Sequence, residues 1–304
     1  MGAPICYGDG IYCIDSGYVR PGLAAIYLLI DNGRAAIIET GCNRSVPLVV
    51  SALDELGIEP TCVDYVIPTH VHLDHAGGAG SMMQIFPRAQ LIVHPRGAQH
   101  LADPSKLIAG TIGVYGADAT SQLYGEILPI DSERIVEALD GLSIPLGTRT
   151  LTCLDVPGHA KHHIVVVDGK TGHIFTGDVF GVSYSELNGK DQQFVFPTTT
   201  PVQFDPQALH ASMDRLLALH PAAVYLTHFG RLHNVERNGA ALHRHIDVFV
   251  AIARDARGSG SERHRQIHDG LVRYALAEVK AVGCDLPEAE ILTLLANDIE
   301  LNAQ

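Results

Sequence analysis

Residues Thr69–His75 read Thr-His-Val-His-Leu-Asp-His and place four potential metal ligands within six positions. They directly follow the apolar run Val63–Ile67, which predicts a short buried strand. Where a chain leaves a strand still extended, side chains two positions apart point the same way, so His70 and His72 can hold one ion together. The adjacent Asp and His that end the stretch fall where the backbone must turn. Their different direction suggests a second ion.

Composition limits the kinds of protein that this chain can be. It has 304 residues, of which 46% are hydrophobic and 18% charged, enough for a core domain and a smaller appendage. The formal net charge of -13 argues against a broad phosphate-neutralising surface, so we expect no nucleic-acid partner. The longest apolar run, Ala24–Ile30, is too short to cross a bilayer, and we expect no membrane partner.

The N-terminal residues and the cysteines bear on the cellular compartment. Residues 1–6 lack a basic region followed by an apolar run, and Cys6 stands where a myristoylation signal requires Ser or Thr. The six cysteines include no close pair of the C-x-x-C type. In a chain of this length they favour reduced thiols over a disulfide framework, so we expect a cytoplasmic protein.

The first part of the chain predicts a β-meander. Its apolar runs are residues 11–14, 25–30 and 35–39. The dipeptide Asn32-Gly33 between the last two runs is a strong hairpin signal.

Helices and a further strand are predicted around the histidine-rich stretch. Residues 45–56 carry apolar side chains at helical spacing and are followed by Gly57, which predicts a helix. We expect Asp74 to cap another helix that begins near Gly78. The apolar residues 90–93 predict the next strand.

Residues 96–140 show no strand pattern, because small and apolar residues alternate there with turn formers. We predict a mostly helical insertion or lid, since segments inserted between strands often carry binding residues. Tyr115 and Tyr124 stand out in it and are candidate walls of a substrate pocket.

Three later junctions repeat the pattern of the first. The apolar runs 151–156, 173–176 and 223–227 each precede a residue of a metal-ligand type with glycine close by. Those residues are His159, Asp178 and His228. Four strands that all deliver His or Asp at their carboxyl ends are hard to explain by packing, so the sequence predicts a metal site.

From residue 238 to the end the apolar residues recur at helical spacing, with breaks at residues 258–260 and near Pro287. We predict a helical extension over residues 238–304 that follows a catalytic domain over residues 1–237. The extension could shape the substrate pocket or could equally form a homodimer surface. Its histidines are expected on solvated faces; they include His243, His245, His264 and His268.

Taken together, the ligand-type residues resemble the binuclear site of the metallo-β-lactamase superfamily. The resemblance covers about residues 8–235 and rests on the cluster HxHxDH, a later Gly-His, a Gly-Asp and a final Thr-His, each after a predicted strand. It implies an α/β fold, an αββα sandwich with the metals at one edge between the sheets, here with a helical insertion and a C-terminal helical extension. The ligands it implies are His70, His72, Asp74, His75, His159, Asp178 and His228.

The resemblance also implies a role for each ligand. One metal would be held by His70, His72 and His159, the other by Asp74, His75 and His228, and Asp178 would bridge the two. Glu39 stands where the family usually has Asp and is expected to orient a ligand histidine. His162 and His163 are expected to pack or to face solvent, and not to bind metal.

The implied chemistry is hydrolysis. Two ions about 3.5 to 4 Å apart share a hydroxide whose pKa they lower towards neutrality. That hydroxide would attack the carbonyl of a small-molecule ester, lactone or thioester, with Asp74 as the catalytic residue that orients it or accepts its proton. Nitrogen and oxygen ligands without cysteine suit two divalent ions, zinc first, with iron or manganese as alternatives.

Among hydrolases the chain is most similar in general terms to glyoxalase II and to N-acyl homoserine lactonases. The segment after Asp178 lacks the Lys and Tyr with which glyoxalase II holds glutathione, which argues against glutathione as the thiol. Phe180 and Tyr184 in that segment are further candidate walls of the substrate pocket.

Two other classes stay open at this point. Diiron relatives that reduce oxygen or nitric oxide typically have Glu where this chain has His72, which favours hydrolysis over an oxygen-binding diiron protein. Persulfide dioxygenase relatives keep the HxHxDH cluster but use one iron, so an iron-dependent redox enzyme is the main alternative. A non-catalytic interaction protein on the same fold is the third.

Overall fold

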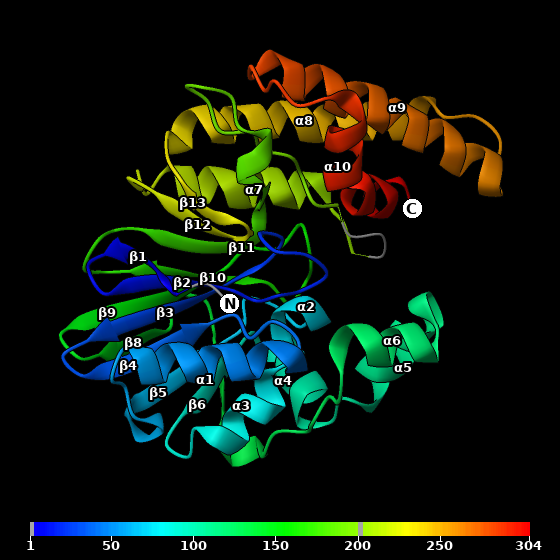
Figure 1. Ribbon diagram of the computed structural model, residues 1–304. Helices are drawn as coiled ribbons and strands as arrows, with labels where there is room; N and C mark the ends of the chain where they lie inside the picture. Colours follow the sequence, from blue (N-terminus) through cyan, green and yellow to red (C-terminus); the bar gives the residue numbers. More distant parts are fainter. Residues whose placement is uncertain (1–2, 200–202) are drawn as a thin grey trace. The chain divides into compact units, whose positions relative to one another are not determined.

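The N-terminal meander that the sequence predicts is present. The computed structural model describes residues 3–199 and 203–304 (Figure 1). In it Asn32-Gly33 joins two antiparallel strands. Both turn residues have a positive φ, 50° for Asn32 and 73° for Gly33, as the tight hairpin turn favoured by Asn-Gly requires. Leu28 faces Ile37 across this hairpin, and both side chains are fully buried.

The hairpin belongs to a seven-stranded sheet in the order β1-β2-β3-β4-β5-β6-β7. The pairs from β1 to β4 are antiparallel and those from β4 to β7 are parallel. The carboxyl ends of β4, β5 and β6 therefore share one edge of the sheet. The strands are β1 (Ile5–Gly8), β2 (Ile11–Asp15), β3 (Ala25–Asp31), β4 (Arg34–Ile38), β5 (Val63–Ile67), β6 (Gln90–Val93) and β7 (Ile135–Glu137).

Three helices bury their apolar faces against this sheet. They are α1 (Val46–Glu55), α3 (Ala79–Ile85) and α4 (Pro95–Ala102) (Figure 1). Val49 of α1 and Met82 of α3 are fully buried in the same hydrophobic core as Val66 of β5. This core fixes the position of the loop that follows β5, which contains the histidine-rich stretch.

The second sheet has six strands in the order β13-β12-β11-β10-β9-β8. Its pairs β8–β9, β9–β10, β10–β11 and β12–β13 are antiparallel. The strands are β8 (Ser143–Leu146), β9 (Arg149–Asp155), β10 (Ile164–Asp168), β11 (Ile174–Val182), β12 (Val224–His228) and β13 (Gly230–Leu232).

Strand β11 is longer than the sequence predicts. The expected end at Thr176 is wrong, because the strand continues to Val182 and all of its residues are buried. Gly177 has a φ of 51°, and a Cβ atom there would lie 2.5 Å from Oγ1 of Thr69 and 2.6 Å from Nε2 of His163. Only glycine fits this position, so Gly-Asp marks an irregular point within the strand and not its end.

The insertion is mostly helical, with one exception. After α4 come α5 (Ser105–Tyr115) and α6 (Ala117–Tyr124). Although residues 96–140 show no strand pattern, they contain β7, which pairs in parallel with β6. With three residues, β7 is too short to produce a recognisable alternation in the sequence.

The helix expected from the cap at Asp74 is arranged differently. Asp74 lies in the first turn of the short helix α2 (Leu73–Ala76), which is preceded by His72. Helix α3 begins at Ala79 after Gly78, and no side chain caps it. The predicted capping role of Asp74 is therefore wrong. Its Oδ2 lies 3.7 Å from Nε2 of His75.

The C-terminal part contains long helices, as predicted. Their bounds, with the remaining helical segments, are α7 (Pro206–Leu217), α8 (Val235–Asp255), α9 (Gly260–Ala281), α10 (Glu288–Ala303), and the 3-10 turns η1 (Asn43–Ser45), η2 (Pro60–Cys62), η3 (Ser132–Arg134) and η4 (Ser185–Leu187). The prediction of a solvated face is wrong for His245, which is 3% exposed. Its Nδ1 lies 2.7 Å from the hydroxyl of Tyr274 on α9.

The chain divides into two compact units. The first contains the residues up to Asp155 and His162–Gly177, and the second contains Val156–Lys161 and Asp178–Gln304. The two sheets, their flanking helices and the C-terminal helices form the α/β sandwich with a helical extension that the sequence predicts.

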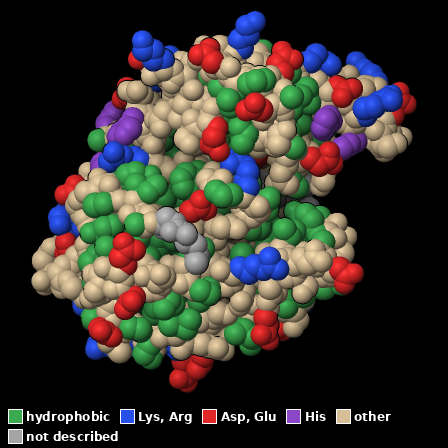
Figure 2. All heavy atoms as spheres, in the orientation of Figure 1, with side chains coloured by type: hydrophobic (Ala, Val, Ile, Leu, Met, Phe, Trp, Pro, Cys, Tyr) green, Lys and Arg blue, Asp and Glu red, His purple; other side chains and the backbone are tan. Residues whose placement is uncertain are grey.

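Two surface properties bear on partners. Among the described residues, none of the helices combines the length and the apolar composition that crossing a membrane requires. On the face shown in Figure 2, the described Lys and Arg side chains are interspersed with Asp and Glu and form no continuous basic area. All six cysteines are free.

Candidate metal centre

The histidine-rich stretch forms the loop after β5 and the short helix α2. His70 and His75 are fully buried, and their ring centroids lie 4.0 Å apart. Nε2 of His70 lies 2.7 Å from Nδ1 of His72. Oδ2 of Asp74 lies 3.7 Å from Nε2 of His75. The first unit thus brings four residues of metal-ligand type together within one loop, as the sequence predicts.

Glu39 holds this loop from the end of β4. Its Oε1 lies 3.0 Å from Nδ1 of His75 and accepts a hydrogen bond from the hydroxyl of Thr69 at 2.6 Å. Its Oε2 accepts from the backbone N–H of Thr69 at 3.1 Å. Because a carboxylate can only accept, Nδ1 of His75 must carry the proton. Nε2 of His75 is then left with the lone pair that a metal needs.

The same reasoning fixes the tautomer of His70. The hydroxyl of Thr69 donates its proton to Glu39, so it can only accept from Nδ1 of His70, which lies 3.1 Å away. Nε2 of His70 therefore has a lone pair and faces the ring of His72. Two histidine nitrogens at this distance are suited to bind one cation together.

His162 and His163 lie beside this group. The ring of His163 stacks on that of His70, with centroids 4.7 Å apart and an interplanar angle of 22°. The centroid of His162 lies 6.1 Å from that of His70 and 5.6 Å from that of His72. Both rings pack against ligand-type histidines.

The second unit contains His159, Asp178 and His228. The two oxygens of Asp178 face different histidines: Oδ2 lies 3.3 Å from Nε2 of His159, and Oδ1 lies 3.6 Å from Nε2 of His228. Asp178 is only 5% exposed, so its negative charge is costly unless cations compensate it. A carboxylate divided between two histidines in this way is suited to bridge two ions.

Thr198 orients His159 much as Thr69 orients His70. Its hydroxyl donates to the backbone carbonyl of Asp178 at 3.2 Å and lies 3.0 Å from Nδ1 of His159. Nδ1 of His159 is therefore the donor, and Nε2 has the lone pair.

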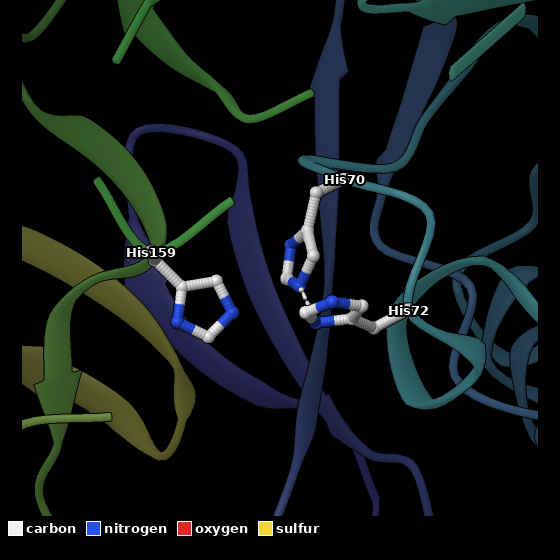
Figure 3. Close-up of side chains that lie close together, drawn as sticks. All are labelled: His70, His72 and His159. Carbon is white, nitrogen blue, oxygen red and sulfur yellow. Dashed lines mark hydrogen bonds between the residues drawn. The ribbon is translucent and has the colours of Figure 1, made fainter. Parts of the chain in front are cut away.

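Three sets of these side chains could each hold a metal ion, because their ligand atoms lie within 4.8 Å of one another. Figure 3 shows the imidazoles of one set, His70, His72 and His159, directed towards one another. The sets are His70, His72 and His159; His70, His75 and Asp178; and Asp74, His75 and His228. The donor atoms are nitrogen and oxygen only. The hydrogen bonds to Nδ1 of His70, His75 and His159 leave the lone pair of each Nε2 available to a metal ion, so the residues fit divalent metal ions.

The predicted walls of the substrate pocket lie in different surroundings. Phe180 is fully buried within β11. Tyr184 is 1% exposed, and its hydroxyl donates to Asp298 of α10 at 3.1 Å. Tyr115 and Tyr124 lie at the ends of α5 and α6, with ring centroids 6.4 Å apart.

The sequence pattern assigns no role to three residues at or near the site. Thr69 directly precedes the first ligand histidine, and its position after a strand was an available signal. Thr198 follows Pro197 far along the chain from His159, and nothing in its local sequence marks it. Tyr18 lies in the loop between β2 and β3, and its hydroxyl lies 3.0 Å from that of Tyr124.

With this geometry in view, comparison with known proteins identifies the family. The sequence profile of the metallo-beta-lactamase superfamily matches residues 19–228. The chain belongs to this superfamily.

Individual relatives are distant. The chain is 27% identical over 232 residues to the metallo-beta-lactamase fold-containing protein ST1585 of Sulfurisphaera tokodaii, covering 73% of this chain and 78% of that protein. It is 27% identical to the acyl-coenzyme A thioesterase MBLAC2 of Bos taurus, over 57% of this chain and 64% of that one. It is 26% identical to a hydroxyacylglutathione hydrolase of Xanthomonas campestris pv. campestris, over 61% of this chain and 54% of that one.

A solved structure agrees on the fold. The metallo-beta-lactamase family protein TTHA1429 from Thermus thermophilus is similar over 96% of this chain and 95% of its own, with a TM-score of 0.66 and 21% identity. The superfamily and its hydrolase relatives support a hydrolase role for the chain.

Proposed function

We propose that the chain is a binuclear metal-dependent hydrolase of small thioesters, esters or lactones. The observation that carries the proposal is the carboxylate of Asp178, whose two oxygens face His159 and His228 separately. A carboxylate that served a single ion would not need histidines on both oxygens. The two hydrolase relatives, a thioesterase and a hydroxyacylglutathione hydrolase, favour a thioester as the first substrate to test.

The ligands divide into two groups with one shared member. We assign His70, His72 and His159 to one ion, Asp74, His75 and His228 to the other, and Asp178 to both. The first two groups are each supported by ligand atoms within 4.8 Å of one another. When bound, the ions would polarise the carbonyl and activate water as the nucleophile.

The chain's own residues supply the rest of the mechanism. Glu39 and Thr69 hold His75 and His70 in the tautomers that binding requires, without contact with substrate. Asp74 is partly exposed, and its Oδ2 lies 3.7 Å from Nε2 of His75; we assign it to orient an attacking water and accept its proton. The burial of Asp178 keeps bulk water away from its carboxylate, which strengthens its attraction for cations.

Zinc is the proposed metal, because imidazole and carboxylate donors without thiolate suit it. The redox alternative would require iron in the same ligands. An iron enzyme would show iron on purification and a visible absorption band, whereas a zinc enzyme would show neither.

A single experiment tests this function. The purified protein is stripped with a chelator, reloaded with zinc, and offered a matched set of a thioester, an ester and a lactone of the same small acyl group. We expect hydrolysis that disappears on stripping and returns with zinc. Activity that survives complete removal of metal, or a zinc-loaded protein that hydrolyses none of the three, would refute the proposal.

A further inference from the structure

A pocket of about 480 Å³ lies next to the histidine-rich loop within the first unit. Its walls come from the loop between β2 and β3, the segment after β4, and helix α6. The lining residues are Gly17, Tyr18, Val19, Cys42, Arg44, Ala119, Gln122 and Leu123. Arg44 provides the one formal charge among these eight residues. The pocket therefore combines polar and apolar surface with a single cation.

Hydrogen bonds tie the pocket to the ligand loop. The backbone N–H of Thr40 donates to the carbonyl of His75 at 2.8 Å, and Gly41 forms a β-bridge with Ala76. Arg44 follows three residues later in η1. The segment that carries the cation is thus fixed on the helix that carries Asp74 and His75.

The other two walls are fixed as well. The hydroxyl of Ser45 donates to the carbonyl of Ser16 at 2.7 Å, which holds the loop with Tyr18. The amide of Asn43 donates to the carbonyl of Glu126 at 3.0 Å, just after α6. These bonds hold all three walls together, so the pocket exists before any ligand binds.

Tyr18 connects the pocket to the ligand loop. Its ring lines the pocket, and its hydroxyl lies 3.0 Å from that of Tyr124. Burial raises the pKa of Tyr18 far above its usual value, and the nearby carboxylate of Asp74 raises this pKa further. Asp74 therefore lies within electrostatic range of the pocket wall.

Arg44 is available to a ligand. In the part of the chain that the structure describes, residues 3–199 and 203–304, no side chain or carbonyl pairs with its guanidinium. An exposed, unpaired guanidinium beside an apolar wall is suited to a carboxylate, which matches its forked donors. The net charge of -13 would repel a polyanionic substrate such as a nucleotide thioester. Among the residues that line the pocket, Arg44 alone carries a positive charge that opposes this repulsion.

We propose that this pocket receives a carboxylate at the far end of the substrate and that Arg44 binds it. The substrate class is a small thioester or ester that carries one carboxylate, joined to the reacting carbonyl by a short apolar chain. The inference rests on the proposed function, because it takes the reacting carbonyl to lie beside Asp74.

A matched pair of substrates tests the pocket. One is S-acetyl-3-mercaptopropionic acid, and the other is its primary amide, which has the same shape without the charge. We expect the wild-type protein to prefer the acid by about fivefold in kcat/KM, through a lower KM, as one partly exposed ion pair allows. The variant Arg44→Gln should lose this preference.

Arg88→Gln is the control variant, because Arg88 is exposed in the turn before β6, at the opposite edge of the sheet from the ligand loop. It should keep the full preference for the acid. A wild-type protein that hydrolyses both substrates equally, or an Arg44→Gln variant that keeps the preference, would overturn the pocket while leaving the hydrolase intact.

A binding measurement distinguishes failure of the pocket proposal from failure of the proposed function. The thioether analogue of the acid cannot be hydrolysed, and its binding is measured by calorimetry on wild type and Arg44→Gln. If no substrate is hydrolysed but the analogue binds about fivefold more weakly to the variant, the proposal that Arg44 binds a carboxylate is supported and the proposed hydrolase function is rejected. Equal binding by both proteins would reject the pocket.

Discussion

Asp178 is the residue on which the proposed site depends. It is buried, and its two oxygens face two histidines. Removing its charge would leave those histidines in place but remove the group assigned to both ions. The sequence identified Asp178 through the Gly-Asp pair, although it lies inside β11 and not after it.

We predict that Asp178→Asn binds at least one metal ion fewer than wild type and loses activity by more than about a hundredfold. The amide keeps the shape of the carboxylate but not its charge, so the fold should persist. Metal content by elemental analysis and turnover of the preferred thioester check this. Asp285→Asn, in the exposed segment before α10, makes the same change away from the site and should behave as wild type. Unchanged metal content in Asp178→Asn would argue against the bridge.

Glu39 is a positioning residue, because it acts through His75 and Thr69. We predict that Glu39→Gln weakens metal affinity by about 10- to 100-fold, since the amide cannot accept from both groups of Thr69 and also orient His75. At saturating metal most of the kcat should return. Affinity is measured by competition with a chelator.

Glu55→Gln serves as the control for this change, because Glu55 is exposed at the end of α1. A Glu39→Gln protein with wild-type metal affinity, or one whose kcat stays low at saturating metal, would mean that Glu39 does not act by orienting the ligand.

At the scale of elements, helices α8 and α9 are joined by a partly buried polar contact. His245 of α8 lies 2.7 Å from the hydroxyl of Tyr274 on α9. Burial lowers the pKa of His245 to about 4, with Glu278 opposing this shift and Arg244 adding to it. In the unfolded chain the pKa of a histidine is about 6.5, so unfolding takes up a proton at mildly acidic pH.

We predict that this contact makes the fold sensitive to acid. The stability that comes from neutral His245 is complete above about pH 6.5 and falls as the pH drops to about 4, by about 3 kcal/mol in total. In His245→Gln the amide can still bond Tyr274 but does not titrate. Urea unfolding of both proteins at equal metal loading, across this pH range, should show a shallower decline for the variant. Parallel declines would show that His245 is not the group that titrates.

The sequence predicted most elements because their patterns are strong and local. The Asn32-Gly33 hairpin, the strand before Thr69 and the helix over residues 45–56 each carry their own signal. The misses have physical causes. Gly177 interrupts the apolar pattern of β11, although the sheet continues through it. Strand β7 is defined by pairing with β6 and not by its three residues.

The site was predictable to a similar extent. His and Asp residues that follow predicted strands can be recognised in the sequence as possible metal ligands. The residues that hydrogen-bond to them cannot be recognised when they come from distant segments of the chain. Thr198 lies 39 residues from His159 and orients it only because the fold brings them together. Tyr18 meets Tyr124 across 106 residues, a contact that no local pattern could reveal.

At the scale of the whole molecule, we propose that a metallo-beta-lactamase superfamily fold uses its two sets of ligands for two zinc ions. The metal content of the protein, purified without added metal and measured by elemental analysis, tests this proposal most directly. We expect about two zinc ions per chain, released together with activity on treatment with a chelator. A protein that contains no more than one ion per chain, or that contains iron with a visible absorption band, would contradict it.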